Sequence, residues 1–209
     1  MKILIVDDHA VVREGLRHIL ADKFRTAQFG EARNAHEALS AARTKKWDAV
    51  VLDITMPGRG GLEVLRELKH SNSKLPVLVL SMHPEDQFAI RVLKSGASGY
   101  MNKESAPNEL VSAIKKILAG GRYISPALAE KMALYLSVDV KRPPHERLSD
   151  REFQIMRLIA AGTTIREIAE ENFLSVKTVR TYRGRILQKM SMKRNAELTR
   201  YAIKSKLLD

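Results

Sequence analysis

Three aspartates stand where two short apolar runs of the chain end. The run Ile3–Val6 is followed directly by Asp7 and Asp8, and the run Ala49–Leu52 is followed by Asp53. If both runs form neighbouring buried strands, the three carboxylates meet at one edge of a sheet, where their mutual repulsion is costly. A divalent cation relieves that cost, and a set of carboxylate oxygens suits Mg²⁺. The pattern therefore predicts a magnesium site that can handle a phosphoryl group.

The composition limits the classes of protein to consider. The chain of 209 residues is long enough for one large or two modest domains, and it contains no cysteine, which excludes disulfides and Cys-ligated zinc. The apolar run before the first acids has only four residues, and no apolar stretch approaches the ~20 residues of a membrane span. We therefore expect a cytoplasmic protein with no membrane partner.

The positive charge is concentrated near the C-terminus. Residues 141–209 carry 16 Lys and Arg against 8 Asp and Glu, which is two thirds of the net charge of +12 in one third of the chain. Such a surface is either merely solvated or binds an acidic partner, of which nucleic acid and anionic membranes are the main kinds.

The first segment alternates between strand and helix patterns. Apolar runs at 3–6, 49–52 and 77–80, with weaker ones at 26–30 and 98–101, predict five strands. Between and after them, apolar residues recur at the three-to-four spacing of helices. Five such units predict a parallel, doubly wound sheet with helices on both faces, and in that class ligands bind beyond the carboxyl ends of the strands. The three aspartates fall at those ends.

Residues 1–121 resemble the receiver domain of bacterial two-component response regulators, which has the flavodoxin-like (CheY-like) α/β fold. The matching positions are Asp7, Asp8, Asp53, Pro57, Gly61, Ser81, Tyr100 and Lys103. The resemblance implies that Asp53 is the phosphoacceptor. It also implies that Mg²⁺ is held by Asp7, Asp8, Asp53 and the backbone carbonyl of Thr55.

The same resemblance implies roles for three more residues. Lys103 would balance the charge of the phosphoryl group, and Ser81 would donate a hydrogen bond to it and move inward. Tyr100 would then move towards the vacated space and repack the face beside it. Met82, which follows Ser81, is expected to narrow access to the phosphoacceptor.

Each of these residues taken singly also has an ordinary structural interpretation. Asp7 or Asp8 could cap a helix that begins near Ala10, Lys103 could be a solvated lysine, and Tyr100 could be a core residue.

A linker is expected over residues 122–147. Gly120 and Gly121 end the preceding helix. Ser125 as an N-cap, with Pro126 after it, predicts an amphipathic helix over 127–136. The polar, proline-bearing stretch Val138–Arg147 then reads as a tether.

Residues 148–209 are predicted to be all-helical. Ser149 and Glu152 have the spacing of a capping box, Thr164 opens a shorter helix, and Ser175 caps a long helix that reaches about Met190. The last helix is expected over 196–207.

The long helix has two different faces. Val176, Val179, Ile186, Leu187 and Met190 gather on one side, and Lys177, Arg180, Thr181, Gly184 and Gln188 gather on the other. A basic amphipathic helix that follows a short helix and a tight turn is typical of a helix-turn-helix, whose recognition helix lies in the major groove of DNA.

This second segment resembles the four-helix DNA-binding domain of the LuxR/NarL type. By that resemblance Lys177, Arg180 and Thr181 contact base edges, with Thr178 at the same end of the helix. Phosphate contacts are expected from Tyr182, Arg183, Arg185 and Lys189. The last helix, through Leu198, Tyr201 and Ala202, resembles the dimerisation helix of that family and would otherwise be a packing helix.

The whole chain is thus identified as a member of the NarL/LuxR type of response regulator, which is a transcription factor rather than an enzyme. The resemblance implies that a sensor histidine kinase phosphorylates Asp53, and that the protein then dimerises on two DNA half-sites. Two alternatives stay open: a DNA-binding regulator that does not depend on phosphorylation and uses the receiver as a dimerisation scaffold, and an aspartyl-phosphate phosphotransfer enzyme.

Overall fold

The computed structural model describes residues 1–58, 60–82, 85–137 and 143–208. The chain divides into two compact units, Met1–Ser137 and Val138–Asp209. None of the described helices combines the length and the apolar character that crossing a membrane requires.

The first unit alternates strands and helices, as the apolar runs predicted. Its elements are β1 (Lys2–Val6), α1 (Ala10–Lys23), β2 (Gln28–Ala32), α2 (Ala35–Thr44), β3 (Ala49–Asp53), α3 (Gly61–Ser71), β4 (Val77–Ser81), α4 (Glu85–Lys94), β5 (Gly99–Asn102), the 3₁₀ turn η1 (Lys103–Ser105), α5 (Ala106–Leu118) and α6 (Pro126–Ser137). All neighbouring strands are parallel, in the order β2-β1-β3-β4-β5. The predicted doubly wound sheet is confirmed.

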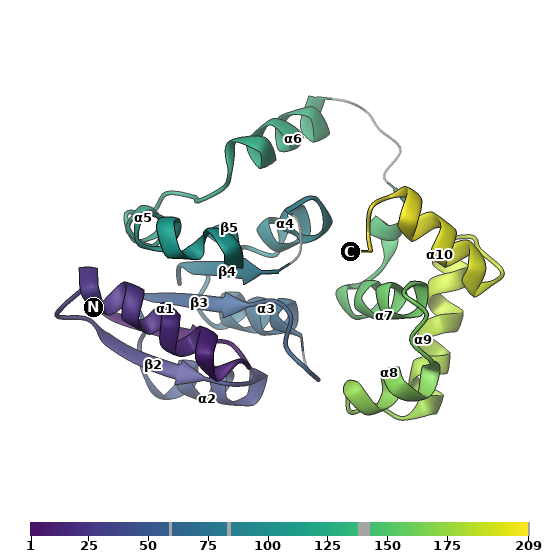
Figure 1. Cartoon of the computed structure of the whole chain (residues 1–209), viewed down its shortest axis with the longest axis horizontal. Coiled ribbons are helices and arrows are strands. Elements are labelled where there is room, and N and C mark those ends of the chain that lie inside the picture. Colours follow the sequence, from purple (N-terminus) through teal and green to yellow (C-terminus); the bar gives the residue numbers. More distant parts are fainter. Residues whose placement is uncertain (59, 83–84, 138–142, 209) are drawn as a thin grey trace. The chain divides into compact units, whose positions relative to one another are not determined.

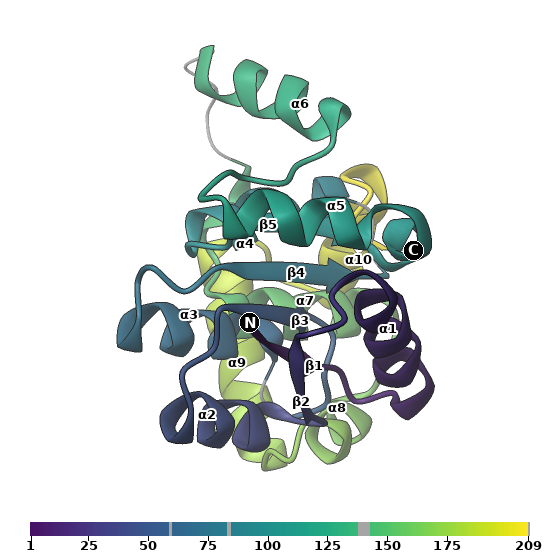
Figure 2. The same ribbon diagram turned by 90° about the vertical axis from the view of Figure 1, so that its left-hand side faces the viewer.

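The strands carry a separate hydrophobic core on each face of the sheet. Leu4, Val50 and Val79 pack with residues of α2, α3 and α4, whereas Ile5 and Val51 pack with residues of α1 and α5. Figure 2 shows α1 on one side of the sheet and α2 and α3 on the other. Because both faces are covered, every residue of β3 and β4 is buried.

The two weaker strands begin later than their apolar runs suggested. β2 starts at Gln28 rather than at residue 26, and β5 starts at Gly99. β2 is an edge strand with only Ala32 buried, so solvent exposure leaves its apolar pattern faint. Its position is set by its pairing with β1, in which Lys2 lies opposite Gln28.

The second unit is helical, as predicted. The 3₁₀ turn η2 (Pro144–Arg147) precedes α7 (Asp150–Ala160), α8 (Ile165–Glu171), α9 (Val176–Lys189) and α10 (Asn195–Lys204). α7 packs against both α9 and α10, and α8 packs against α9 (Figure 1). Arg157 of α7 donates a hydrogen bond to the carbonyl of Leu207, at 2.7 Å, and so ties the last residues to this core.

The helix starts of the second unit follow the predicted capping residues. Ser149 and Glu152 form the capping box of α7, and Thr164 forms a second box with Glu167 on α8. Ser175 accepts a hydrogen bond from the amide of Thr178 at the start of α9. α10 begins at Asn195 and ends at Lys204, three residues before the predicted end.

Candidate functional site

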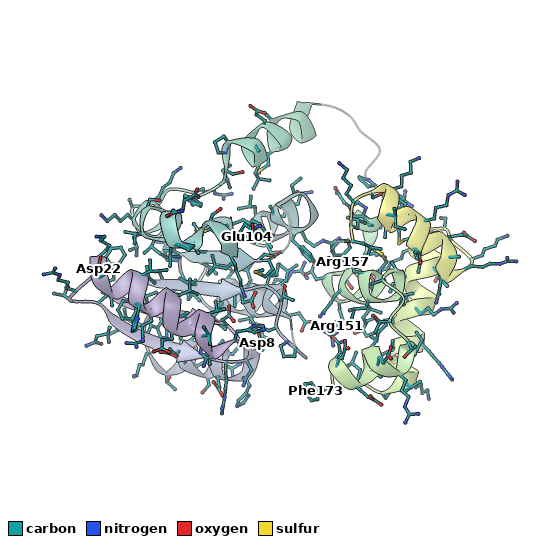
Figure 3. The ribbon with its side chains drawn as sticks, in the orientation of Figure 1. Asp8, Asp22, Glu104, Arg151, Arg157 and Phe173 are labelled. Carbon is teal, nitrogen blue, oxygen red and sulfur yellow. The ribbon has the colours of Figure 1, made fainter. Side chains whose placement is uncertain are left out.

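The acid cluster forms because β1 and β3 are neighbours. Val6 pairs with Leu52, so Asp7, just beyond β1, and Asp53, the last residue of β3, lie side by side. One ligand atom from each of Asp7, Asp8, Asp53 and His9 lies within 4.8 Å of the others. Asp7 and Asp53 are buried, whereas Asp8 is partly exposed at the edge of the unit (Figure 3). The three acids therefore meet as their positions predicted.

Gly61 allows the chain to pass close to the end of β3. Its amide donates to the carbonyl of Ile54 at 3.1 Å, and a Cβ added at Gly61 would lie 2.1 Å from the carbonyl oxygen of Asp53. A side chain there would collide with backbone, which cannot move aside easily. The glycine thus shapes the loop that follows Asp53.

Lys103 lies between two of the acids. It begins the η1 turn after β5, and its ammonium lies 2.8 Å from Asp53 Oδ2 and 2.7 Å from Asp7 Oδ2. Partial burial by itself would lower the pKa of Lys103, but the carboxylates of Asp53 and Asp7 outweigh that effect and raise it. Lys103 is therefore ion-paired with two acids rather than freely solvated.

The groups around Asp53 have opposite effects on the pKa of its carboxyl group. Burial raises the pKa of Asp53 to about 6, an increase that Lys103 and the Thr55 amide oppose and that the Asp7 charge supports. The Thr55 amide donates to Asp53 Oδ1 at 2.9 Å, while Lys103 contacts Oδ2. Because both oxygens have a partner, the carboxylate is held in one orientation, and a pKa of about 6 leaves it mostly ionised at pH 7.

The cluster fits a hard divalent cation. Asp7 Oδ2 and Asp8 Oδ1 are buried and accept no hydrogen bond from the described residues. Each has only an ion-pair contact, from the Lys103 ammonium at 2.7 Å and from His9 Nδ1 at 3.2 Å respectively. Carboxylate oxygens left with unused lone pairs at such a site are suitable ligands for Mg²⁺. Thr55, the predicted carbonyl ligand, lies exposed two residues beyond Asp53.

Sequence reasoning missed His9. Its ring Nδ1 lies 3.4 Å from Asp7 Oδ1 and 3.2 Å from Asp8 Oδ1, and its amide donates to Asp7 Oδ1 at 2.8 Å. Through this hydrogen bond Asp7 also accepts the backbone amide of His9, which is the N-cap residue of α1. The available signal was the position of His9 directly after the acid pair.

Ser81 and Tyr100 lie on the two strands beyond β3. Ser81 ends β4, next to Leu80, the residue that pairs with Asp53. Tyr100 of β5 pairs with Val79 and is completely buried in the core that faces α4. In this structure Tyr100 therefore already occupies an inward position.

α9 presents an exposed basic face. Lys177, Arg180 and Arg185 are exposed and make no ion pair or side-chain hydrogen bond with the described residues. Thr181 is exposed, and its hydroxyl donates a hydrogen bond to the carbonyl of Lys177. Thr178 contacts the Ser175 hydroxyl at the helix start. Cations on a rigid helix without partners inside the protein are suited to phosphates and base edges.

Three α9 residues have surroundings that the helical wheel alone did not specify. Val176, expected on the apolar side, is the first residue of α9 and is 38% exposed. Arg183 is half-buried and donates to Asn195 Oδ1 at 2.7 Å, and Lys189 lies 2.6 Å from Glu152. Both cations thus bind other elements of the same unit, and their role as phosphate contacts stays a prediction. Tyr182 is partly buried.

The predicted dimerisation residues, whose role stays a prediction, all have contacts within their own unit. Leu198 and Ala202 of α10 are completely buried within the unit, where α10 packs against α7. The Tyr201 hydroxyl lies 2.7 Å from His145 Nδ1 in the η2 turn. These side chains stabilise the fold itself, so any contact of α10 with a second copy requires its exposed residues, of which Ile203 is 64% exposed.

Comparisons with known proteins agree with both units. Residues 3–115 match the family described as response regulator receiver domain, and residues 146–202 match bacterial regulatory proteins of the luxR family. The chain is 40% identical to response regulator UvrY of Escherichia coli over 205 residues, 98% of this chain and 94% of that protein. It is also 40% identical to response regulator GacA of Pseudomonas aeruginosa over 210 residues, 100% and 98% of the two chains.

Solved structures show the same likeness. A LuxR-family two-component response regulator from Aurantimonas has 40% identity and a TM-score of 0.59, covering 66% of this chain and 98% of that one. RcsB from Salmonella enterica, bound to promoter rprA in the presence of the phosphomimetic BeF₃⁻, has 25% identity and a TM-score of 0.66, covering 96% and 98%.

Proposed function

Because the chain belongs to the NarL/FixJ family of LuxR-type response regulators, we propose that phosphorylation of Asp53 by a sensor histidine kinase controls its binding to DNA. The single observation that carries this proposal is the buried Asp53 carboxylate, held between the Thr55 amide and the Lys103 ammonium and flanked by two further acids. A DNA-binding regulator of this kind acts in the cytoplasm.

The acids and Lys103 around Asp53 support the following phosphoryl transfer. An Asp53 oxygen forms a bond to phosphorus, the bond from phosphorus to the histidine nitrogen of the kinase breaks, and that nitrogen keeps the electron pair. Asp7, Asp8, Asp53 and the Thr55 carbonyl would hold Mg²⁺. When bound, the cation supplies charge that lessens the repulsion between the acids and the phosphoryl oxygens. Lys103 adds a second positive charge from the η1 turn.

Ser81 and Tyr100 would make the phosphorylated state different from the unphosphorylated one. The Ser81 hydroxyl ends the strand next to Asp53 and would donate a hydrogen bond to a phosphoryl oxygen. Tyr100 lies on the following strand and would adjust its packing to the new position of Ser81. A two-state core residue of this type converts a local charge into a change of surface.

In the second unit, DNA recognition is assigned to the exposed face of α9. Lys177, Arg180 and Thr181 would contact base edges, and Arg185 would contact a phosphate, since all four are exposed. The homodimer expected on two half-sites would use exposed residues of the protein rather than Leu198 or Ala202.

The first test is the intact mass of the protein after incubation with acetyl phosphate and Mg²⁺. One added phosphoryl group is expected on the wild type, and none without Mg²⁺ or on Asp53→Ala. DNA affinity of both forms is then compared. A protein that gains no phosphoryl group, or whose DNA affinity does not change when it does, would act instead as a phosphorylation-independent regulator.

A further inference from the structure

Helix α6 belongs to the receiver unit, although the sequence suggested that it is part of the linker. The compact unit Met1–Ser137 includes the whole of α6, which packs against α4 (Figure 1). The tether that leads to the second unit therefore begins only after this helix. Of the predicted tether Val138–Arg147, residues 138–142 lie outside the described residues and Pro144–Arg147 form the η2 turn. How α6 is attached to the receiver then determines what the tether responds to.

The chain that enters α6 is hydrogen-bonded to the strand that carries Tyr100. The amide of Tyr123 donates to the carbonyl of Ser98 at 2.9 Å, and the amide of Tyr100 donates to the carbonyl of Tyr123 at 3.0 Å. β5 is the last strand of the sheet, so Tyr123 occupies its otherwise open edge. The backbone of Tyr100 is thus directly bonded to the segment before α6.

This close approach depends on Gly99. A Cβ added there would lie 2.7 Å from the carbonyl oxygen of Tyr123, too near for any real side chain. The Tyr123 hydroxyl also donates to the Glu109 carboxylate on α5. Tyr123 is therefore held by both its backbone and its side chain against β5 and α5.

α6 also shares a hydrophobic core with Tyr100. Leu128 is 1% exposed and packs in the core that contains Tyr100 and the α4 residues Ala89, Val92 and Leu93. The Ser125 hydroxyl oxygen accepts a hydrogen bond from the Leu128 amide at 3.1 Å, which makes Ser125 the predicted cap and fixes the start of the helix. Ile124 and Met132 pack at the margin of the same core.

We infer that α6 is the element through which the receiver passes the state of Asp53 to the tether. Interiors are close-packed, so a change in the packing of Tyr100 must be accommodated within its core, and Leu128 belongs to that core. The Tyr100–Tyr123 hydrogen bond provides a second, independent connection. The inference rests on the proposed function, because it concerns how phosphorylation is transmitted. It also means that α6 of the same chain covers part of α4.

The first test is hydrogen exchange of the full-length protein with and without Mg²⁺ and BeF₃⁻, a mimic of the phosphoryl group. We expect the protection of amides over residues 124–137 to change in the wild type, and to stay constant in Asp53→Ala. Changed exchange in β4 and α4 with constant exchange in α6 would overturn the inference. No change anywhere in the receiver would instead contradict the proposed function.

The second test removes the attachment of α6 while keeping the phosphorylation site. Leu128→Ala should bring the ratio of DNA affinities between phosphorylated and unphosphorylated protein towards about 1, because the coupling free energy is lost. Phosphoryl incorporation, measured by intact mass, should be retained. The matched control is Glu130→Ala, at an exposed position of the same helix, which should keep the wild-type ratio. An unchanged ratio in Leu128→Ala, in protein with wild-type circular dichroism, would refute the role of α6.

Discussion

The ammonium of Lys189, in the last turn of α9, lies 2.6 Å from the buried carboxylate of Glu152, in the first turn of α7. Glu152 also accepts the amide hydrogen bond of Ser149 at 2.7 Å, as part of the capping box. One carboxylate thus completes the cap of α7 and joins α9 to α7. Because Lys189 serves this contact, it has a structural task that a solvated cation on a DNA-binding face does not have.

We expect Lys189→Met to destabilise the second unit. Removal of the cation leaves the Glu152 carboxylate, 4% exposed, without its ion-pair partner. Breaking a fully buried ion pair lowers the free energy of unfolding by about 3–5 kcal/mol. Because Lys189 is 42% exposed, we expect a smaller loss of about 1–2 kcal/mol here. The free energy of unfolding of this unit is measured by urea denaturation, with the hydrogen exchange of the α7 amides as the readout. Lys204→Met, at an exposed position of α10, is the control and should change little.

The same pair should make the stability of this unit depend on acid. Burial alone would raise the pKa of Glu152, but the hydrogen bonds from Lys189 and Ser149 outweigh it and hold that pKa below 4.5. A carboxyl group whose pKa is lower in the folded state stabilises the fold above its unfolded pKa, and this stabilisation is lost as the pH falls through the folded pKa. The contribution should be constant from pH 7 to about 5 and decline below about 4.5.

The control for this pH dependence is Glu152→Gln, which cannot ionise. Its free energy of unfolding should fall less steeply with acid than that of the wild type over the same range. Parallel curves for the two proteins below pH 4.5 would show that Glu152 does not titrate as the structure indicates.

The exposed cations of α9 should differ from Lys189 in DNA binding. Arg185→Ala should weaken binding similarly on all sequences and reduce the slope of log affinity against log salt by about 1, as loss of one phosphate contact does. Arg180→Ala should also relax the preference for particular base pairs. Fluorescence anisotropy at several salt concentrations distinguishes these outcomes. Lys189→Met should leave the salt slope unchanged. If Lys189→Met instead reduces the slope as much as Arg185→Ala does, Lys189 contacts a phosphate.

Lys103 should compete with the metal in the unphosphorylated protein. Its ammonium contacts Asp7 and Asp53, two of the predicted magnesium ligands. Loss of this charge at short range should tighten Mg²⁺ binding by about fivefold in Lys103→Met, since even well-screened charges a few ångströms apart interact by about 1 kcal/mol. Calorimetric titration measures the affinity, with Lys115→Met on the exposed side of α5 as the control. Equal affinity in the wild type and Lys103→Met would show that the lysine leaves the metal ligands free.

Met82 should limit the exchange of the phosphoryl group. It follows Ser81, the last residue of β4, and its side chain is 60% exposed and lies outside the core. Met82→Ala should speed both phosphorylation by acetyl phosphate and spontaneous dephosphorylation, as followed by intact mass over time. Identical rates in the two proteins would exclude a role of Met82 in access.

Local features of the chain were enough to predict the acid cluster at one edge of the sheet. Asp7, Asp8 and Asp53 follow apolar runs, and parallel strands in this class of sheet place the residues at their carboxyl ends together. The helix starts at Ser149, Thr164 and Ser175 were equally predictable, because capping depends on residues only three positions apart. The first residues of β2 and β5 were harder to predict, because pairing with a neighbouring strand sets where an edge strand begins.

The sequence by itself determined the order of the elements, the acid cluster at the end of β1 and β3, and the basic helix of the second unit. Each of these depends on residue type and on spacing along the chain. Only the tertiary structure decided that Lys189 faces Glu152, that Leu198 lies inside its unit, and that Leu128 shares a core with Tyr100. These contacts join residues that are distant in the chain, and a helical period shows that a face is apolar without showing which surface covers it.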